Sequence, residues 1–435
     1  MAMASIRPRA VRALGTQLSR LVLPRYTFVA VRHYGVAPPL PANTILDPLT
    51  GELTTPPDIQ PSRLEIVKNE NPKSLPDPKS LVFGHTFTDH MLTIPWSSKS
   101  GWGQPKIQPY GPFSLQPSAT VLHYAQTLFE GMKAYRDQNG KVTLFRPDMN
   151  MKRMNTSAQR LALPTFNGDA LLELIKTLVK IDRHWIPQLP GYSLYVRPTM
   201  MGTQAALGVS APNEALLFVI CSPVGPYYAG GFKPVALHAS TEWVRAFPGG
   251  TGGFKLGANY APGVVPQLEV AKQGFAQNLW LHGPEHYLTE VGTMNLFVVF
   301  RKPDGTIELT TPPLDGMILP GVTRDSVVTL ARGHASKSLP LTGLPEKFEI
   351  NERAVTMPEV KAAAENGSLV EMFGAGTAAI ICPVNKIGYL GEDVPVPTGD
   401  DDAGLGPVAR VMLNEISGRQ LGTIPSDWSV IVSEE

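Results

Sequence analysis

The stretch Gly249-Gly-Thr-Gly-Gly-Phe-Lys255-Leu-Gly-Ala-Asn-Tyr260-Ala-Pro262 sets one lysine among five glycines, with a tyrosine five residues further on. Most lysines are solvated surface charges, but this one has aromatic neighbours and almost no other charge beside it. Removal of an amine from water lowers its pKa, so such a lysine can be a neutral nucleophile and base near pH 7. The stretch therefore predicts a chemically active lysine.

A carboxylate completes the pattern, because Glu290 follows Lys255 after 35 residues, at the predicted end of a strand. A lysine amine condenses with an aldehyde, a phenol such as Tyr260 can hydrogen-bond a ring oxygen, and a carboxylate keeps a ring nitrogen protonated. The three groups favour an enzyme that uses pyridoxal phosphate. A phosphate-binding loop is the alternative, and its pattern fails because Phe254 precedes the lysine and Leu256 follows it.

The length of 435 residues suggests two domains, and 43% hydrophobic and 17% charged residues are typical of a globular protein. A net charge of +1 gives no reason to expect a nucleic-acid partner. Residues 1–46 nevertheless hold six arginines and no acidic residue. We therefore expect a mitochondrial presequence over residues 1–35 and a protein of the mitochondrial matrix, the alternative being a basic tail without targeting value.

Neither metals nor membranes are expected as partners. Cys221 and Cys382 are the only cysteines, which argues against a disulfide scaffold and a structural zinc site. The nine histidines lack the spacing of metal ligands. The chain also has no apolar run of about 18 residues, the length that a membrane span needs.

Composition divides the rest of the chain into four segments. A Pro-rich arm is expected over 36–80, a small N-terminal domain over 81–221, and a large C-terminal domain over 235–435. The connection 222–234 is predicted to be the linker, because its first ten residues hold two prolines and three glycines.

Apolar spacing predicts both helices and strands without regular alternation, which favours an α+β fold with mixed sheets. The predicted helices cover residues 121–133, 169–183, 263–273 and 323–334. The predicted strands cover residues 81–95, 106–115, 193–197, 215–221, 235–238 and 278–282, followed by a hairpin through 287–300.

Three further places could hold an anion. Gly321-Val322-Thr323 forms a glycine turn into a predicted helix, where free N–H groups can bind phosphate. Gly376-Thr377-Ala378 is a small-residue loop whose backbone could approach a carboxylate or a phosphate closely. Arg146 and Arg153 stand seven residues apart, and a guanidinium fits phosphate oxygens. The alternatives are an ordinary helix start, a tight turn and two surface charges.

These segments together resemble the branched-chain amino-acid aminotransferases, which are fold-type-IV pyridoxal-phosphate enzymes. The similar blocks span most of residues 80–390. They are FEGMKAY (129–135), LFRPDMNMKRM (144–154), YVRPTMMGT (195–203), GGTGGFKLGANYAP (249–262), EVGTMNLF (290–297), LDGMILPGVTRDS (314–326) and EMFGAGTAAIICPV (371–384).

The resemblance implies two domains with the cofactor at their interface. It also implies that Lys255 holds the cofactor and transfers the proton, that Tyr260 contacts the ring oxygen, and that Glu290 contacts the ring nitrogen. The residues implied for the phosphate are Arg153, Val322, Thr323, Gly376 and Thr377. Those implied for the substrate are Phe129, Tyr195, Arg197, Tyr227, Thr377 and Ala378, together with Tyr124 and Leu207, which in this family of homodimers reach the pocket of the partner subunit.

The activity implied is reversible transamination of Leu, Ile and Val with 2-oxoglutarate. Mammalian relatives carry a redox-active CxxC pair, of which only Cys382 remains here because Ala379 occupies the first position, so we expect no thiol switch. Two alternatives stay open at this point. One is another fold-type-IV enzyme, a D-amino-acid aminotransferase or an aminodeoxychorismate lyase, and the other is a binding or regulatory protein that kept the fold without turnover.

Overall fold

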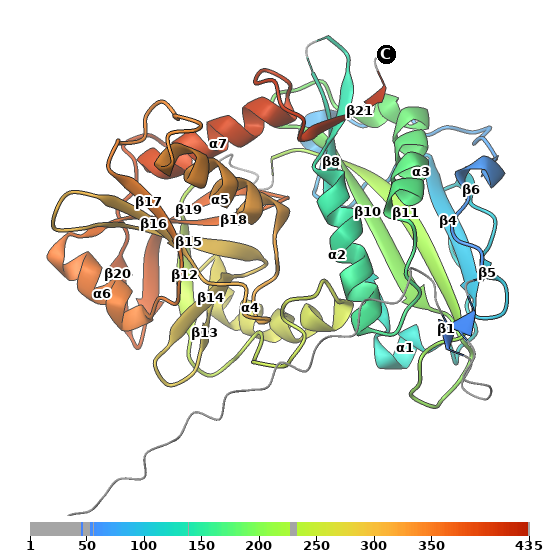
Figure 1. Ribbon diagram of the computed structural model, residues 1–435, viewed down its shortest axis with the longest axis horizontal. Coiled ribbons are helices and arrows are strands. Elements are labelled where there is room, and N and C mark those ends of the chain that lie inside the picture. The colour runs from blue at the N-terminus through green and yellow to red at the C-terminus, as the bar shows by residue number, and fades with distance from the viewer. Residues whose placement is uncertain (1–44, 47–52, 55, 138, 227–232, 434–435) are drawn as a thin grey trace, which may run out of the picture. The chain divides into compact units, whose positions relative to one another are not determined.

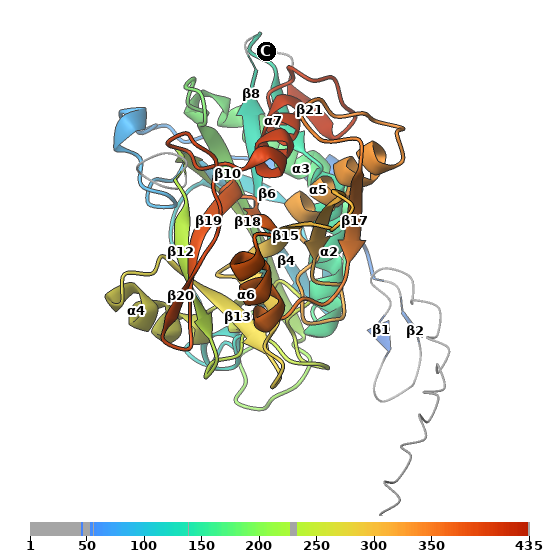
Figure 2. The same cartoon turned by 90° about the vertical axis from the view of Figure 1, so that its left-hand side faces the viewer.

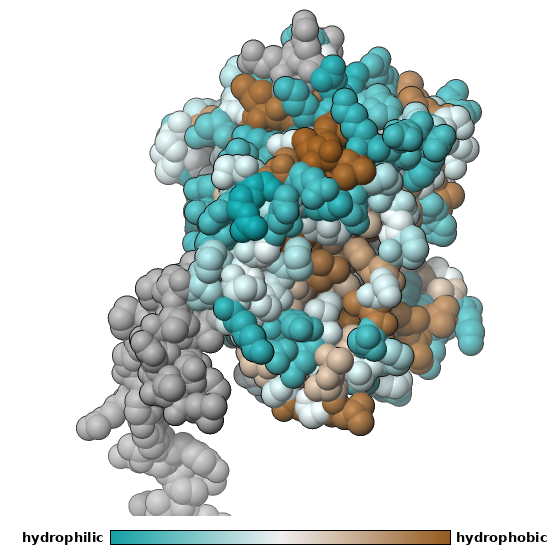
Figure 3. Space-filling view, turned by 90° about the vertical axis from the view of Figure 1, so that its right-hand side faces the viewer, coloured by the Kyte–Doolittle hydropathy of each residue, from teal (hydrophilic) through white to brown (hydrophobic). Residues whose placement is uncertain are grey.

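The computed structural model describes residues 45–46, 53–54, 56–137, 139–226 and 233–433, all within the compact unit Pro41–Glu435. The predicted presequence lies outside these residues. Over the described part of the chain, no helix combines the length and the apolar character that crossing a membrane requires. One face of the molecule carries hydrophilic and hydrophobic residues side by side (Figure 3).

Among the described residues, ten strands form a first sheet in the order β21-β9-β8-β10-β11-β4-β6-β3, with β5 paired to β4 and β7 to β10. All of its pairings are antiparallel except that of β3 with β6. Its strands are β3 (Glu65–Ile66), β4 (His90–Ser97), β5 (Gly101–Trp102), β6 (Lys106–Pro109), β7 (Thr127–Phe129), β8 (Met132–Arg136), β9 (Val142–Phe145), β10 (Ser193–Gly202), β11 (Glu214–Val224) and β21 (Ser429–Ser433). A separate short pair joins β1 (Ile45–Leu46) to β2 (Leu53–Thr54).

A second sheet of nine described strands runs β14-β13-β12-β19-β18-β15-β16-β17, with β20 paired to β19. Strand β12 is parallel to both of its neighbours and β16 is parallel to β17, while the other pairings are antiparallel. The prediction of an α+β fold with mixed sheets is therefore confirmed. The strands are β12 (Val235–Ser240), β13 (Gln277–His282), β14 (Tyr287–Val291), β15 (Met294–Arg301), β16 (Ile307–Thr311), β17 (Phe348–Glu352), β18 (Leu369–Gly376), β19 (Ile380–Tyr389) and β20 (Glu392–Pro395).

Amphipathic helices cover the sheets (Figures 1 and 2). Helix α3 (Gly168–Ile181) turns Leu171, Leu174, Ile175 and Leu178 into the core of the first sheet, and the Asn167 side chain caps its first turn. Helices α2 (Pro147–Arg160), α5 (Val322–Ala335), α6 (Met357–Asn366) and α7 (Pro407–Gln420) likewise bury one face, with α2 packing on α3 and α5, α6 and α7 contacting the second sheet. Two further α-helices of the described residues are α1 (Val121–Tyr124) and α4 (Val264–Lys272).

Two segments late in the sequence contact the first sheet. Leu256, next to Lys255, is 1% exposed within the core of the first sheet and forms a bridge with Leu128. Strand β21, within the predicted second domain 235–435, pairs with β9 at one end of the same sheet. The Pro-rich arm also contributes Ile59 to this core. The division at 222–234 stays a prediction, and residues 227–232 of that linker lie outside the described part.

Local patterns failed at several elements. The predicted helix 121–133 is wrong beyond Tyr124, because Ala125 has a φ of +50° and the following residues form β7 and β8, which pair with β10. The strand predicted at 81–95 begins only at His90, since a turn with Gly84 at φ +73° precedes it. The strand predicted at 106–115 ends at Pro109. Helix α2 was not predicted at all.

Candidate active site

Segments from both sheets meet around one cavity of about 340 Å³. The glycine-rich stretch, the start of α5, the β18–β19 turn and strands β7 and β10 all contribute to its wall. The lining residues are Phe83, Phe129, Gly131, Arg153, Tyr195, Arg197, Lys255, Tyr260, Gln277, Thr293, Met294, Asn295, Leu319, Gly321, Val322, Thr323, Ala375, Gly376, Thr377, Ala378 and Ala379. Most of the residues predicted from the sequence to bind cofactor or substrate therefore line this cavity.

Backbone contacts fix Lys255 in this wall. Its N–H donates to Ser157 Oγ of α2 at 2.9 Å, and its carbonyl accepts from the N–H of Phe129 at 3.1 Å. Gly252 is required nearby, because a Cβ at that position would come within 2.2 Å of the carbonyl oxygen of Met317. The glycines thus allow the stretch to pack closely while the lysine side chain enters the cavity.

The Lys255 amine has an environment suited to a base. Nζ donates to the Tyr260 hydroxyl at 3.0 Å and lies 4.8 Å from the centre of the Phe129 ring. Burial lowers the pKa of Lys255 to about 8, and the nearby Arg153 charge acts in the same direction. Burial also raises the pKa of Tyr260 to about 12, so its phenol keeps its proton at neutral pH. A minor but usable fraction of the amine, roughly a tenth at pH 7, is therefore neutral, far more than for an ordinary lysine.

This pKa can be measured directly on the cofactor-free protein. Acetylation with acetic anhydride across a pH series, read by peptide mass mapping, should label Lys255 with a midpoint near pH 8 because only the neutral amine reacts. Lys361 is the internal control, since its hydrogen bond to Glu392 raises its pKa and its labelling should need more alkaline solution. Labelling of the two lysines with the same midpoint would contradict the assignment.

Glu290 lies immediately behind the cavity wall. Its buried carboxylate pairs with Nε of Arg245 at 2.9 Å and accepts from the Leu319 N–H at 2.8 Å and the Asn295 amide at 3.1 Å. Burial raises the pKa of Glu290, while the charge of Arg245 opposes that rise. Leu319 and Asn295 line the cavity, so the carboxylate stands one residue layer from its interior.

The start of α5 forms one end of the cavity. The N-cap residue Gly321 supplies no side-chain cap to the first turn of α5, and Val322 and Thr323 of that turn line the cavity. A Cβ at Gly321 would meet Asn295 Oδ1 at 2.0 Å, which explains a glycine here. Gly376 and Thr377, between β18 and β19, line the same cavity. This arrangement suits a phosphate group.

Arg153 extends from α2 to the cavity, and each of its three guanidinium nitrogens donates a hydrogen bond within the protein. Nε and Nη2 donate to the two oxygens of Glu130 at 2.7 and 2.8 Å, and Nη1 donates to the carbonyl of Pro320 at 2.9 Å. Although burial opposes ionisation of Glu130, the Arg153 charge holds the pKa of this carboxyl below its usual range. A phosphate contact of Arg153 therefore has to use its remaining N–H groups.

Aromatic and cationic residues surround the rest of the cavity. Arg197 stacks 4.8 Å from the Phe129 ring centre and 5.2 Å from that of Tyr195, and its buried Nε has no hydrogen-bond partner among the described residues. Gly131 leaves room for the Tyr195 hydroxyl, which a Cβ would approach to 1.9 Å. These residues offer apolar surface and a cation in the same space.

The structure does not bring every predicted residue into this cavity. Tyr124 and Leu207 hydrogen-bond each other away from its lining and are 39% and 76% exposed. Tyr227 lies outside the described residues. Sequence reasoning missed Phe83, because it treated residues 81–95 as a strand. It also missed the buried partners Glu130 and Arg245, although Glu130 stands beside Phe129 in one of the quoted blocks.

The cavity fits pyridoxal phosphate in three respects. Lys255 supplies an amine with a lowered pKa, the open helix start and the glycine turns supply a cradle for phosphate, and Glu290 stands behind Asn295 as a buried carboxylate. Tyr260 is within hydrogen-bond distance of the amine. An aldehyde bound by the lysine would therefore find phosphate and ring partners in place.

Comparison with known proteins agrees with this geometry. The family model "Amino-transferase class IV" matches residues 127–387. The mitochondrial branched-chain-amino-acid aminotransferase of Saccharomyces cerevisiae is 52% identical over 384 residues, covering 88% of this chain and 95% of that protein. The cytosolic enzyme of the same yeast is 52% identical over 376 residues, covering 86% and 97%.

Solved structures are similar as well. The branched-chain amino acid aminotransferase of Escherichia coli aligns with a TM-score of 0.62 and 23% identity over 79% of this chain and 99% of that chain, which supports the fold alone. The T.th. branched-chain amino acid aminotransferase, solved with N-(5'-phosphopyridoxyl)-L-glutamate, aligns with a TM-score of 0.59 and 26% identity over 78% and 98%. This chain belongs to the class IV aminotransferase family and, within it, to the branched-chain amino-acid aminotransferases.

Proposed function

We propose that the protein transfers the amino group of Leu, Ile or Val reversibly to 2-oxoglutarate, giving branched-chain 2-oxo acids and glutamate. The observation that carries this proposal is the Lys255 amine, which has a pKa of about 8 and contacts Tyr260 in a cavity with aromatic, cationic and phosphate-cradling walls. The mitochondrial and the cytosolic branched-chain-amino-acid aminotransferases of Saccharomyces cerevisiae support this substrate class, because each is 52% identical to this chain.

The proposed cofactor is pyridoxal 5'-phosphate. Two similar structures of the T.th. enzyme support this choice, one solved with a phosphopyridoxyl-glutamate compound and one with pyridoxamine 5'-phosphate. When bound, this cofactor supplies a protonated ring that disperses the negative charge developed at the substrate Cα. Its phosphate is assigned to Val322, Thr323, Gly376, Thr377 and Arg153.

The chain's own residues supply positioning and proton transfer. The neutral amine of Lys255 removes the substrate Cα proton and later returns a proton, a role that its lowered pKa permits at neutral pH. Tyr260 orients the amine through its hydrogen bond and is assigned to the ring oxygen. Glu290, whose negative charge Arg245 stabilises, is assigned to the ring nitrogen. The amides of Thr377 and Ala378 are assigned to the substrate carboxylate.

One pocket must accept both an aliphatic side chain and the charged side chain of glutamate. Phe129, Tyr195 and Tyr227 are assigned to the aliphatic group, and Arg197 to the second carboxylate, because its Nε lacks a hydrogen-bond partner among the described residues. An additional methylene changes binding by only about 1–3 kcal/mol, so preferences among Leu, Ile and Val should be shallow.

Arg197→Met should separate the two kinds of substrate. A hydrogen bond to a charged group contributes about 1.5–3 kcal/mol, so KM for 2-oxoglutarate should rise about ten- to hundredfold. KM for leucine should change by less than about threefold, because Met keeps the apolar surface over Phe129. Steady-state kinetics with each substrate varied provides the test. An equal increase in both KM values would remove Arg197 from carboxylate recognition.

The active protein is proposed to be a homodimer, with Tyr124 and Leu207 reaching the pocket of the partner subunit. Exposed apolar side chains support this assembly, because a subunit interface would remove them from water. They belong to Leu122, Tyr124, Leu207, Val209, Trp243, Val244, Phe247, Val264, Val265 and Leu268. Light scattering coupled to gel filtration would test it, and an active monomer would refute it.

Targeting to the mitochondrial matrix is proposed from residues 1–35, which are rich in arginine and free of acidic residues. Mitochondrial relatives of Saccharomyces cerevisiae and Schizosaccharomyces pombe, 52% and 46% identical, support this proposal, although a cytosolic yeast relative is equally similar. N-terminal sequencing of protein purified from cells would test it, because removal of the segment is expected.

The proposed reaction has a direct spectroscopic test. Purified protein loaded with pyridoxal phosphate is mixed with leucine alone, and the visible absorption of the bound cofactor should change within one half-reaction. Addition of 2-oxoglutarate should then restore the original spectrum. A response to D-amino acids instead would favour the other fold-type-IV activities, and no response to any amino acid would favour a protein that has lost turnover.

A further inference from the structure

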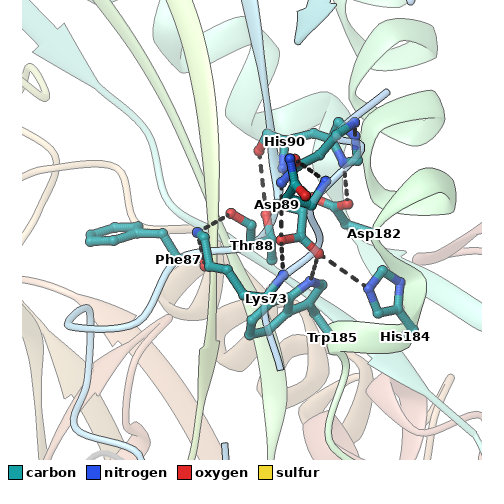
Figure 4. A network of polar contacts seen from close by, with 10 residues as sticks. Lys73, Phe87, Thr88, Asp89, His90, Asp182, His184 and Trp185 are labelled. Carbon is teal, nitrogen blue, oxygen red and sulfur yellow. Dashed lines mark hydrogen bonds and ion pairs between the residues drawn. The ribbon is translucent and has the colours of Figure 1, made fainter. Parts of the chain in front are cut away.

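A polar network lies outside the cavity, where the Pro-rich arm meets the first sheet (Figure 4). Its central carboxylate, Asp89, is 1% exposed and accepts from the Trp185 indole at 2.9 Å and from the backbone N–H of Lys73 at 2.9 Å. The Lys73 ammonium donates to the carbonyls of Phe87 and Thr88 at 3.0 and 2.9 Å. Lys73 therefore joins the chain on both sides of residues 74–86, which we call the clasp loop.

The neighbouring His90–Asp182 pair strengthens this junction and is not a catalytic dyad. His90 Nδ1 lies 2.7 Å from Asp182 Oδ1, and His90 Nε2 accepts from the N–H of Asn69 at 2.9 Å. Both ring nitrogens are thus occupied, and the ring ties the arm to β4 and to the residue after α3. Neither His90 nor Asp182 lines the cavity, which fits a structural anchor.

The clasp loop carries one aromatic residue into the active-site cavity. Phe83 lines that cavity, and its ring meets the ring of Tyr195 edge-on with centroids 5.1 Å apart and an interplanar angle of 75°. The turn that presents Phe83 is closed by a hydrogen bond from His85 N–H to Val82 O and needs Gly84 at φ +73°. Most of the other loop residues are exposed, so the loop depends on its ends for its position.

The ends of the loop are held unequally. Thr88 and Asp89 belong to the sheet side, because the Thr88 N–H donates to Cys221 O and the Tyr110 N–H donates to Asp89 O. Lys73 approaches them from the arm, and its ammonium also lies 5.0 Å from the centre of the Tyr110 ring. Removal of the ammonium would release two carbonyl contacts at once and leave the sheet side intact.

We propose that Lys73 and Asp89 are positioning residues that close the clasp loop and thereby hold Phe83 as a wall of the substrate pocket. Neither residue lines the cavity, so both act through Phe83. This inference rests on the proposed function, because the wall it sets would face the aliphatic side chain of the amino donor. Loosening the wall weakens substrate binding and leaves the Lys255 chemistry unchanged.

The decisive variant is Lys73→Met, which keeps most of the unbranched side chain and removes the ammonium. We expect KM for leucine to rise about three- to tenfold with kcat within about twofold, since the loss affects ground state and transition state alike. Lys73→Arg should restore most of the affinity. The matched control is Lys79→Met on the same loop, because the Lys79 ammonium makes no hydrogen bond or ion pair with any described residue.

A double-mutant cycle with Phe83→Leu distinguishes positioning from general stability. If Lys73 acts through Phe83, Lys73→Met should raise KM by less than about twofold in the Phe83→Leu background. Equal effects in both backgrounds, or an unchanged KM in the single Lys73→Met variant, would overturn the proposal.

Hydrogen exchange supplies a readout that does not depend on turnover. Amides of residues 74–86 should exchange faster in Lys73→Met than in Lys79→Met, while the peptide around Lys255 exchanges as before. Unchanged protection of the clasp loop would also overturn the proposal. Failure of the unmodified protein and of the Lys79→Met control to turn over leucine would instead refute the proposed function, and the exchange result would still test the loop.

Discussion

Lys255→Ala should abolish transamination, with kcat/KM for leucine falling at least about 10⁴-fold. General acid–base catalysis alone contributes about 10²–10⁴-fold, and the variant also removes the amine that holds the cofactor. No other described lysine lines the cavity, so no second amine can replace it. Steady-state rates and the visible absorption of protein incubated with pyridoxal phosphate measure the two losses separately.

The matched control is Lys361→Ala, which removes a partly exposed lysine that pairs with Glu392 and does not line the cavity. A surface ion pair contributes little to stability, so this variant should keep the full rate and spectrum. Lys255→Arg keeps the positive charge without a neutral amine and should be as inactive as Lys255→Ala. Borohydride reduction followed by peptide mapping should place the label on residue 255, and a label on another residue would refute the assignment.

Glu290→Gln should retain bound cofactor but lose most of the rate. An adjacent opposite charge shifts a pKa by about 1–3 units, so removing the carboxylate should lower the protonation constant of the ring nitrogen about ten- to thousandfold. A hundredfold loss corresponds to about 2.7 kcal/mol of transition-state stabilisation. The expected result is a reduced kcat with the KM values and the cofactor content close to those of the unmodified protein.

Stability must be separated from catalysis in this variant, because Glu290 also neutralises Arg245. Breaking a buried ion pair by removing one partner can destabilise a protein by about 3–5 kcal/mol. Glu308→Gln is the matched control, since Glu308 is 6% exposed and pairs with Arg353 away from the cavity. Both variants should lower the melting temperature, but only Glu290→Gln should lower the rate of the cofactor-loaded protein. Equal rates would show that pairing at the ring nitrogen is unnecessary.

Local sequence predicted the helices whose apolar periodicity is strong. Residues 169–183 were predicted as a helix and α3 spans Gly168–Ile181, because a continuous apolar stripe and the Asn167 cap act within a few turns. The same reasoning failed at 121–133, where apolar residues at helical spacing form β7 and β8. Their backbone groups pair with β10 residues that lie 60 to 74 positions later in the chain, and a periodicity pattern contains no information about that partner.

Candidate site residues were predicted with similar limits. Chemistry-bearing residues in unusual settings, such as Lys255 among glycines, could be recognised without a fold. Their buried partners could not, because Glu130 and Arg245 are ordinary charges until the fold places them against Arg153 and Glu290. The place of Phe83 in the cavity wall could not be predicted either, because it depends on the fold of the clasp loop, which brings the Phe83 ring to Tyr195.

The sequence by itself determined the reactive group of this protein and the family to which it belongs, because a lysine in a small-residue loop and seven ordered blocks are properties of the chain order. Only the tertiary structure determined the pKa values of the residues in the cavity. The Lys255 pKa of about 8 arises from desolvation and from the charge of Arg153, a residue 102 positions earlier that reaches the cavity on α2. Burial and through-space charge depend on distances between segments, and those distances exist only once both sheets have closed around the cavity.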